Sequence, residues 1–183
     1  MKADSKRSNT DTRRSYEAEL ADLYMEYYDK IAHYASCHIS NKTDAEDIAG
    51  EVFLKALESL GSYKKRGIPM QAWLFKIAHN LVVDYLRKMS KRKVVDIESI
   101  TVTSDESPEM AAEVNIEIDR VKKAMGLLTQ EQRQVLSLRF LGELTSKETA
   151  AIMGKSDGAV REMQRAATVK LRELLALENN DMK

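Results

Sequence analysis

The sequence predicts an all-α protein of two small helical lobes joined by a flexible acidic linker. Among its 183 residues, seven glycines and two prolines are too few for the many tight turns of a β-rich fold. Apolar residues recur at helical spacing along most of the chain, but this period stops over residues 93–106, which are acidic. We therefore expect a disordered basic tail over residues 1–15, lobes over 16–92 and 108–178, and a linker over 93–107. Lobes of this size have only marginal cores.

The first lobe should hold three helices, over about residues 16–38, 44–60 and 69–91. Thr43 and Glu46 have the spacing of a capping box, which would start the second helix at Asp44. Pro69 suits the first position of the third helix because its φ angle is fixed at a helical value.

The second lobe should begin with a helix at Ser107-Pro108 and continue with helices over about residues 130–141, 146–153 and 157–177. Two capping boxes predict the starts of the first two of these, namely Thr129 with Gln132 and Thr145 with Glu148. Gly142 and Gly154 mark the breaks between the helices.

Charge is sorted along the chain, although the net charge is zero. Residues 17–60 hold ten acids and three bases, residues 61–92 hold eight bases and one acid, and residues 93–118 hold seven acids and one base. From residue 119 onward there are twelve bases and nine acids. This sorting indicates an acidic surface for one partner and basic surfaces for another, and ordinary solvated faces are the alternative.

Composition favours a cytoplasmic protein. The single cysteine, Cys37, cannot form an internal disulfide, the first sixteen residues are too polar for a signal peptide, and no apolar run could span a membrane. His33 and Cys37 lie one helical turn apart, as two metal ligands would, but no third ligand follows at motif spacing. No catalytic motif is visible, so we expect no enzyme, metal or cofactor.

The most informative motif is a predicted helix-turn-helix, formed by helix 146–153, a tight turn and helix 157–177. On a helical wheel, Arg161, Arg165 and Thr168 fall opposite the apolar side chains, and Ser156 is a suitable N-cap. Such a helix fits the major groove of DNA, where arginine bonds guanine or phosphate. A solvated helix face is the alternative.

A second basic surface is predicted where the loop carrying Lys64, Lys65 and Arg66 meets the third helix. One side of that helix carries Lys76, Asn80 and Arg87. Single-strand binders combine positive charge with pockets for unstacked bases, and Asn80 could bond the edge of such a base. For Trp73, packing in the core is the favoured interpretation.

The second helix has an acidic side, formed by Asp44, Asp47, Glu51 and Glu58. It suits a basic protein surface, although an acidic helix face taken alone is more often simply solvated.

Three segments resemble the extracytoplasmic-function sigma factors of bacterial RNA polymerase: DAEDIAGEVFLKAL (44–57), MQAWLFKIAHNLVVDYLRK (70–88) and the helix-turn-helix segment with its preceding helix (128–175). The resemblance covers nearly the whole chain outside the tail and linker. It implies a factor that directs core polymerase to specific promoters, melts the −10 element and starts transcription. Region 2 of such a factor would then be the first lobe, and region 4 the second.

The resemblance also implies the partners of particular residues. Core polymerase, through the clamp helices of its beta-prime subunit, would be bound by Asp44, Asp47, Glu51 and Phe53. The −10 element would be contacted by Lys64, Lys65, Arg66, Gln71, Lys76, Asn80 and Arg87, and the −35 element by Ser156, Asp157, Arg161, Glu162, Arg165 and Thr168. The resemblance further implies contact with the beta flap and an anti-sigma protein that inserts between the lobes. Gly50 stands where many members carry a polar residue.

Two other interpretations stay open from the residues alone. A stand-alone helix-turn-helix regulator would bind duplex DNA without polymerase, and a metalloenzyme built on His33 and Cys37 would hold zinc. Binding to core polymerase followed by run-off transcription distinguishes all three.

Overall fold

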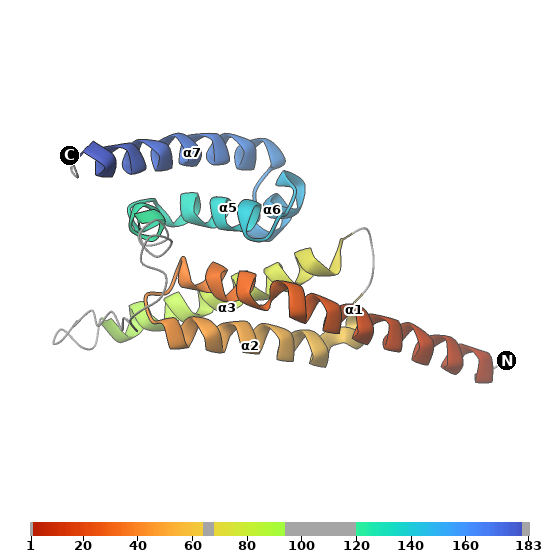
Figure 1. The fold of residues 1–183 in the computed structure, drawn as a ribbon. Coiled ribbons are helices and arrows are strands. Elements are labelled where there is room, and N and C mark those ends of the chain that lie inside the picture. The colour runs from red at the N-terminus through yellow and green to blue at the C-terminus, as the bar shows by residue number, and fades with distance from the viewer. Residues whose placement is uncertain (1, 64–67, 94–119, 181–183) are drawn as a thin grey trace.

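The structure, a computed structural model, describes residues 2–63, 68–93 and 120–180, with side chains over 13–63, 68–91 and 120–177. Every regular element in these ranges is helical, which confirms the all-α fold class. The first lobe comprises α1 (Lys2–Ser36), α2 (Lys42–Ser59), the short 3-10 helix η1 (Leu60–Ser62) and α3 (Met70–Lys93). The second lobe comprises a helical stretch over 120–126, α5 (Gln130–Phe140), α6 (Ser146–Met153) and α7 (Asp157–Asn180) (Figure 1). The predicted linker beyond residue 93 and the predicted helix start at Ser107-Pro108 lie outside the described residues.

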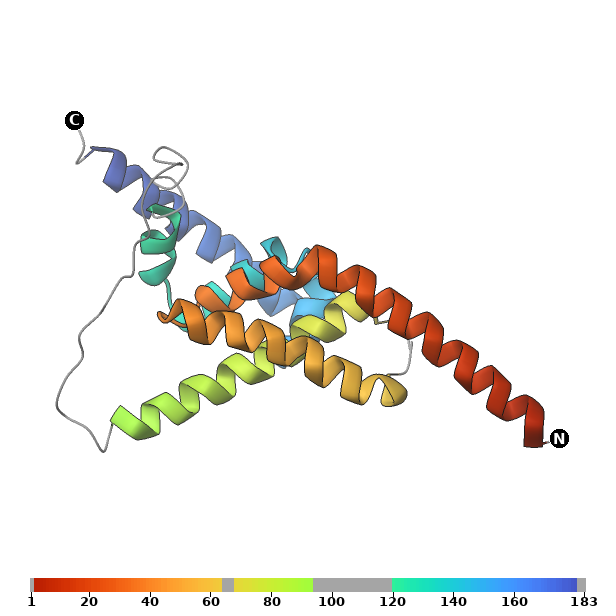
Figure 2. The same ribbon diagram turned by 60° about the horizontal axis from the view of Figure 1, so that its bottom comes forward.

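Helix α1 corrects the prediction of a disordered tail over residues 1–15. It runs from Lys2 to Ser36, and its amino-terminal part projects beyond the other helices in both views (Figures 1 and 2). No glycine or proline interrupts residues 2–36. Arg13 bonds Glu17 at 2.9 Å across the predicted boundary, and such i,i+4 pairs stabilise a helix modestly. The boundary near residue 15 was predicted from the basic composition of the tail, and basic residues by themselves do not end a helix.

The start of α2 differs from the predicted capping box of Thr43 and Glu46. Asn41 is the N-cap, and its side-chain oxygen accepts a hydrogen bond from the backbone N–H of Asp44 at 3.1 Å. Asparagine is among the best N-cap residues, so a cap two residues upstream lengthens the helix and leaves Thr43 inside its first turn.

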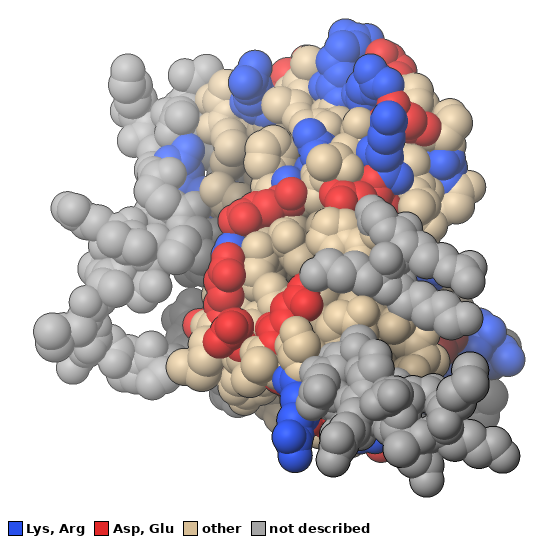
Figure 3. Space-filling view, turned by 90° about the vertical axis from the view of Figure 1, so that its right-hand side faces the viewer, with Lys and Arg blue, Asp and Glu red and all other residues tan. Residues whose placement is uncertain are grey.

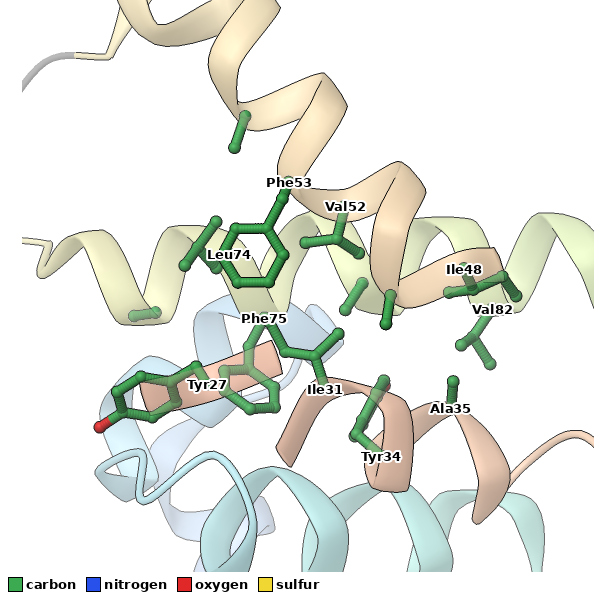
Figure 4. Close-up of a cluster of buried hydrophobic side chains, with 14 of the residues drawn as sticks. Tyr27, Ile31, Tyr34, Ala35, Ile48, Val52, Phe53, Leu74, Phe75 and Val82 are labelled. Atoms are coloured by element: carbon green, nitrogen blue, oxygen red, sulfur yellow. The ribbon is translucent and has the colours of Figure 1, made fainter. Parts of the chain in front are cut away.

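The core of the first lobe lies between α1, α2 and α3. Figure 4 shows Ile31 and Tyr34 of α1, Val52 and Phe53 of α2, and Phe75 of α3 converging there. The rings of Tyr34 and Phe75 meet edge to face, with centroids 5.7 Å apart, an arrangement that aromatic pairs favour. Burial raises the pKa of Tyr34, whose hydroxyl lies 3.2 Å from Nδ1 of His79.

The second lobe is built as its capping signals predicted. Both expected capping boxes, at Thr129 and at Thr145, are present with their reciprocal hydrogen bonds. Its own core is small, and it includes Val135 of α5, Val160 of α7 and Ala167 of α7, each fully buried.

The two lobes pack directly against each other. Leu138 of α5 and Leu144, which precedes α6, belong to the hydrophobic cluster of the first lobe and are 0% and 1% exposed. Figure 1 shows α5 and α6 lying alongside α1 and α3, and α6 contacts α3. Because a small lobe has a marginal core, burial across this boundary adds to the stability of both lobes.

Candidate nucleic-acid interface

The geometry of α6, the turn and α7 is that of a helix-turn-helix. Gly154 ends α6 in the left-handed conformation, with φ +63°, which glycine adopts at no steric cost. Ser156 then caps α7, since its hydroxyl accepts a hydrogen bond from the N–H of Ala159 at 3.2 Å. Val160 and Ala167 point inward and are fully buried, whereas Arg161 and Arg165 are exposed. The predicted amphipathic division of this helix is therefore present.

The two arginines, which we call the arginine face, each have an acidic partner on their own helix. Arg161 forms an ion pair with Asp157, and Arg165 forms one with Glu162 at 2.7 Å. The hydrogen bonds from Ser146 and Arg161 lower the pKa of Asp157, and that from Arg165 lowers the pKa of Glu162. Both arginines keep about two thirds of their side chains exposed, at 67% and 70%. They are therefore accessible to a polyanion, which would compete with these carboxylates.

Figure 3 views the molecule from the end where α6 meets α7. Lys and Arg gather over the upper part of this face, on the second lobe, and Asp and Glu are concentrated in the middle of the view. The residue charges are thus sorted in space as well as along the chain.

Helix α3 carries the second predicted surface, which we call the amide face and define as Lys76, Asn80 and Arg87. All three side chains are exposed, and Arg87 pairs with Asp84 at 2.9 Å. Asn80 opens into a hollow of about 490 Å³ between α2 and α3. This hollow is lined by Lys55, Glu58, Ser59, Trp73, Ile77, Asn80, Leu81 and Asp84. It combines an apolar floor with an amide, which suits a planar base, but Glu58 and Asp84 would repel a phosphate.

Trp73 is partly buried and packs against the core, as predicted, but it also lines this hollow. Its ring meets that of Tyr63 at a centroid distance of 4.9 Å. The Tyr63 hydroxyl donates a hydrogen bond to the carbonyl of Ile68 at 2.9 Å, which ties together the two described ends of the loop. Lys64, Lys65 and Arg66 lie outside the described residues. Tyr63 was not among the predicted site residues, although an aromatic residue directly before a basic loop was a visible signal in the sequence.

Gln71, predicted to act with the amide face, lies elsewhere. It is half-buried, and its side-chain amide donates a hydrogen bond to the carbonyl of Gly142 in the second lobe. The structure therefore groups Lys76, Asn80 and Arg87 but separates Gln71 from them.

Of the predicted acidic side of α2, Asp47, Glu51 and Glu58 are exposed, and we call Asp47 and Glu51 the acidic face. Asp44 is half-buried and accepts a hydrogen bond from the Tyr85 hydroxyl at 2.5 Å. Phe53 is 7% exposed and packs on the ring of Tyr24 at 5.0 Å, so it supports the helix from within. Glu51 also pairs with Lys55 at 3.2 Å.

The histidines and the cysteine do not converge. His33 is exposed and bonds the carbonyl of Asp29, whereas His38 is buried with Nε2 lying 3.2 Å from the Ser137 hydroxyl. Burial raises the pKa of the Cys37 thiol, which makes it a poorer metal ligand. Among the described residues, no group of three or more histidines, cysteines or carboxylates could hold a metal ion. Nor does any helix in those ranges have the length and apolar character needed to cross a membrane.

Two family models match the chain. The model of Sigma-70 region 2 matches residues 23–92, and that of Sigma-70 region 4 matches residues 124–173. The first includes the acidic and amide faces, and the second includes the arginine face.

Individual relatives are similar over most of the chain. The ECF RNA polymerase sigma factor ShbA of Streptomyces griseus is 36% identical over 138 residues, which cover 70% of each chain. The ECF RNA polymerase sigma factor BldN of Streptomyces coelicolor is 34% identical over 155 residues. The match covers 84% of this chain and 59% of the length of BldN. Among solved structures, the sigma factor RpoE of Bartonella quintana, in complex with the anti-sigma factor NepR, has a similar fold. Its TM-score is 0.68 at 23% identity, and the match covers 86% of this chain and 97% of that one.

Proposed function

Since the chain belongs to the extracytoplasmic-function sigma factors of RNA polymerase, we propose that it brings core polymerase to specific promoters and opens them through residues on three faces. The observation that carries this proposal is the helix-turn-helix, whose apolar side is sealed in the second lobe while Arg161 and Arg165 are presented outward.

The arginine face is proposed to bind the −35 element in the major groove. The first turns of a recognition helix lie closest to base edges, and here they carry Ser156, Asp157, Arg161, Glu162, Arg165 and Thr168. An arginine that bonds guanine twice gives specificity at one position, and an arginine on phosphate gives affinity at every sequence. Glu162 could accept a hydrogen bond from cytosine once its arginine partner moves to DNA.

The amide face is proposed to take part in melting the −10 element, together with the basic loop carrying Lys64, Lys65 and Arg66. Asn80 lines a hollow of about 490 Å³ in which Trp73, Ile77 and Leu81 offer apolar contact to an unstacked base. Lys76 and Arg87 lie beside it on the same side of α3, where they would contact the strand backbone.

The acidic face is proposed to bind core polymerase, with the clamp helices of the beta-prime subunit as the partner. Asp47 and Glu51 are exposed, and the buried ring of Phe53 with the Asp44–Tyr85 hydrogen bond holds the helix that presents them. Charge complementarity of this kind mainly speeds association and fixes orientation. The beta flap is the proposed partner of the second lobe.

An anti-sigma protein is a further proposed partner, supported by the NepR complex of RpoE from Bartonella quintana. A helix inserted between the lobes would first have to separate the buried contacts of Leu138 and Leu144. Binding across the outer faces of both lobes requires no such separation, and it would cover the acidic face directly.

The decisive experiment adds the purified chain to core polymerase and measures co-elution, then run-off transcription from a promoter library. We expect a stable complex and transcripts from a restricted set of promoters that share −35 and −10 sequences. Duplex binding without any complex with polymerase would instead identify a stand-alone regulator.

A further inference from the structure

Arg139, in the last turn of α5, joins that helix to α7 and to the segment before α6. Helix α7 packs on α5 (Figure 1). Nε of Arg139 donates a hydrogen bond to the side-chain oxygen of Gln164 on α7 at 2.8 Å. Nη1 of the same guanidinium donates to the carbonyl of Leu144, directly before the cap of α6. Arg139 and Gln164 are both half-buried, so the bond between them lies within the lobe and not at its outer surface.

Gln164 lies at the boundary between the buried side of α7 and the arginine face. At about 100° per residue, the fully buried Val160 and Ala167 fall about 40° and 60° to one side of Gln164. The exposed Arg161 and Arg165 fall about 60° and 100° to its other side. A hydrogen bond at this boundary therefore controls how far the arginine face is turned outward.

The apolar side of α7 leaves this rotation less sharply defined. Val160 and Ala167 have short side chains, and the hydrophobic effect that buries them has no preferred direction. Met163, which packs beside them, is unbranched and can adapt to a small turn of the helix. A hydrogen bond depends on angle as well as distance, so the bond between Arg139 and Gln164 supplies the missing direction.

The start of α7 is held by different contacts. Asp157, its first residue, accepts a hydrogen bond from Ser146 at the start of α6. In the turn before α7, Lys155 pairs with Glu131 of α5 at 2.8 Å. These contacts determine where α7 begins, but a helix held at its start can still turn slightly further along. The bond at Gln164, about two turns after Asp157, holds the helix at the level of the arginine face.

We propose that Arg139 is a positioning residue for recognition of the −35 element: acting through Gln164, it sets the rotation of α7 and aligns the arginine face with base edges, without itself touching DNA. The proposal rests on the assignment of the arginine face to the −35 element under Proposed function. Two bonds from one arginine to guanine form only within about 0.5 Å of the productive geometry. A phosphate contact is largely electrostatic and tolerates more movement. Loss of the bond should therefore reduce selectivity more than affinity.

A merely structural role for Arg139 predicts a different result. Lost stability lowers the fraction of folded protein, so binding weakens by the same factor at every DNA sequence. Selectivity is a ratio of affinities, and such a factor cancels from it. A turn of α7 instead moves both arginines at once, so discrimination should fall at several −35 positions together. Removal of a single arginine relaxes recognition at its own position alone.

The experiment assembles the full chain with core polymerase and measures transcription from a library randomised over the −35 element, with the −10 element held at its selected sequence. Gln164→Ala removes the acceptor and introduces a good helix former. We expect it to lower discrimination about three- to tenfold at several positions. Gln164→Glu keeps an acceptor oxygen for Arg139 and should retain wild-type discrimination, with weaker overall binding because of its negative charge. Gln130→Ala, at an exposed position of α5, is the control and should change nothing.

Arg139→Gln tests whether Arg139 acts through Gln164. We expect lower discrimination at the same positions, and the double variant with Gln164→Ala should lose no more than Arg139→Gln alone. Fluorescence titration of each holoenzyme with the selected promoter duplex, at several salt concentrations, gives the dependence of affinity on salt. This dependence should be the same in wild type, Arg139→Gln and Lys123→Gln, which removes an exposed cation from the same lobe.

Each result decides the proposal. Unchanged discrimination in Gln164→Ala would overturn the positioning role. Relaxation at one base position alone would make Gln164 a base contact instead. A salt slope reduced by about one unit in Arg139→Gln would make Arg139 a phosphate ligand. A wild-type holoenzyme without any −35 preference would overturn the proposed function of the arginine face, and the positioning role with it.

Discussion

A carboxylate oxygen of Glu162 lies 2.7 Å from the guanidinium of Arg165, three residues further along α7. This pair occupies the face that we propose binds the −35 element, so the arginine must exchange a carboxylate for DNA. The same pairing raises the pKa of Arg165 further above its ordinary value, and an arginine stays charged with or without such a partner.

We expect Glu162→Gln to strengthen binding to duplex DNA of any sequence by a few-fold, because it frees Arg165 and removes one negative charge near the phosphates. Fluorescence titration at several salt concentrations measures this. Glu173→Gln, at another exposed position of α7, is the control for the change in net charge. A loss of preference at a single −35 base would instead assign Glu162 to base recognition.

Asn80→Ala should impair opening of the promoter more than its initial binding. The amide is exposed and lines the hollow between α2 and α3, and its loss removes the hydrogen bonds that we propose an unstacked base forms there. Permanganate footprinting reports the opening, and gel-shift titration reports the binding. Gln130→Ala removes an exposed amide from the second lobe and should change neither. Normal melting with unaltered base preference would exclude Asn80 from the site.

Asp47→Lys and Glu51→Lys should each weaken binding to core polymerase by about tenfold or more, because each places a cation where we propose that a basic surface docks. Both side chains are exposed, so helix content should not change. Asp22→Lys makes the same charge change at an exposed position of α1 and serves as the control. Equal affinities for all four proteins would remove the acidic face from the interface.

Acid should destabilise the fold through His38. Burial lowers its pKa to about 3, and Arg133 and His79 act in the same direction. The unfolded chain takes up this proton below about pH 6.5 and the folded chain does not. Stability is therefore present above about pH 6.5 and is lost progressively toward pH 3, by up to about 1.4 kcal/mol per pH unit. The lowered pKa of His79 adds to the slope.

Urea unfolding between about pH 7 and pH 5 measures the slope before the carboxylates titrate. His38→Asn should flatten it, whereas His33→Asn, at an exposed position, should not. Equal slopes in wild type and His38→Asn would show that His38 is not kept neutral by the fold.

Local chemistry predicted the helices of the second lobe well, since Thr129 and Thr145 each form a capping box with the residue three positions later and Gly154 ends α6 as expected. At α2 it failed because Asn41 and Thr43 are both capable caps, and only the packing of the first turn chooses between them. At α1 the change in composition near Tyr16 suggested a boundary, although no residue there opposes a helix.

The helical periodicity of the apolar residues could not predict the contacts between the lobes. The periodicity shows that Leu138 is buried but not against what, and Leu144 stands between two helices where no period applies. Gln71 and Gly142 are 71 residues apart, and His38 and Ser137 are 99 apart. Because the contact with Gly142 could not be predicted, Gln71 was grouped with the amide face. In the structure its side-chain amide instead bonds the second lobe.

The hydrogen bond from Tyr63 to Ile68 has an evolutionary consequence. It fixes the span between the two ends of the basic loop, while the Tyr63 and Trp73 rings anchor that span to α3. Residues between these two points can then be exchanged or inserted without shifting the helix that follows. If this segment contacts the −10 element as proposed, promoter preference can diverge between gene copies through changes in it alone, with the protein scaffold inherited intact.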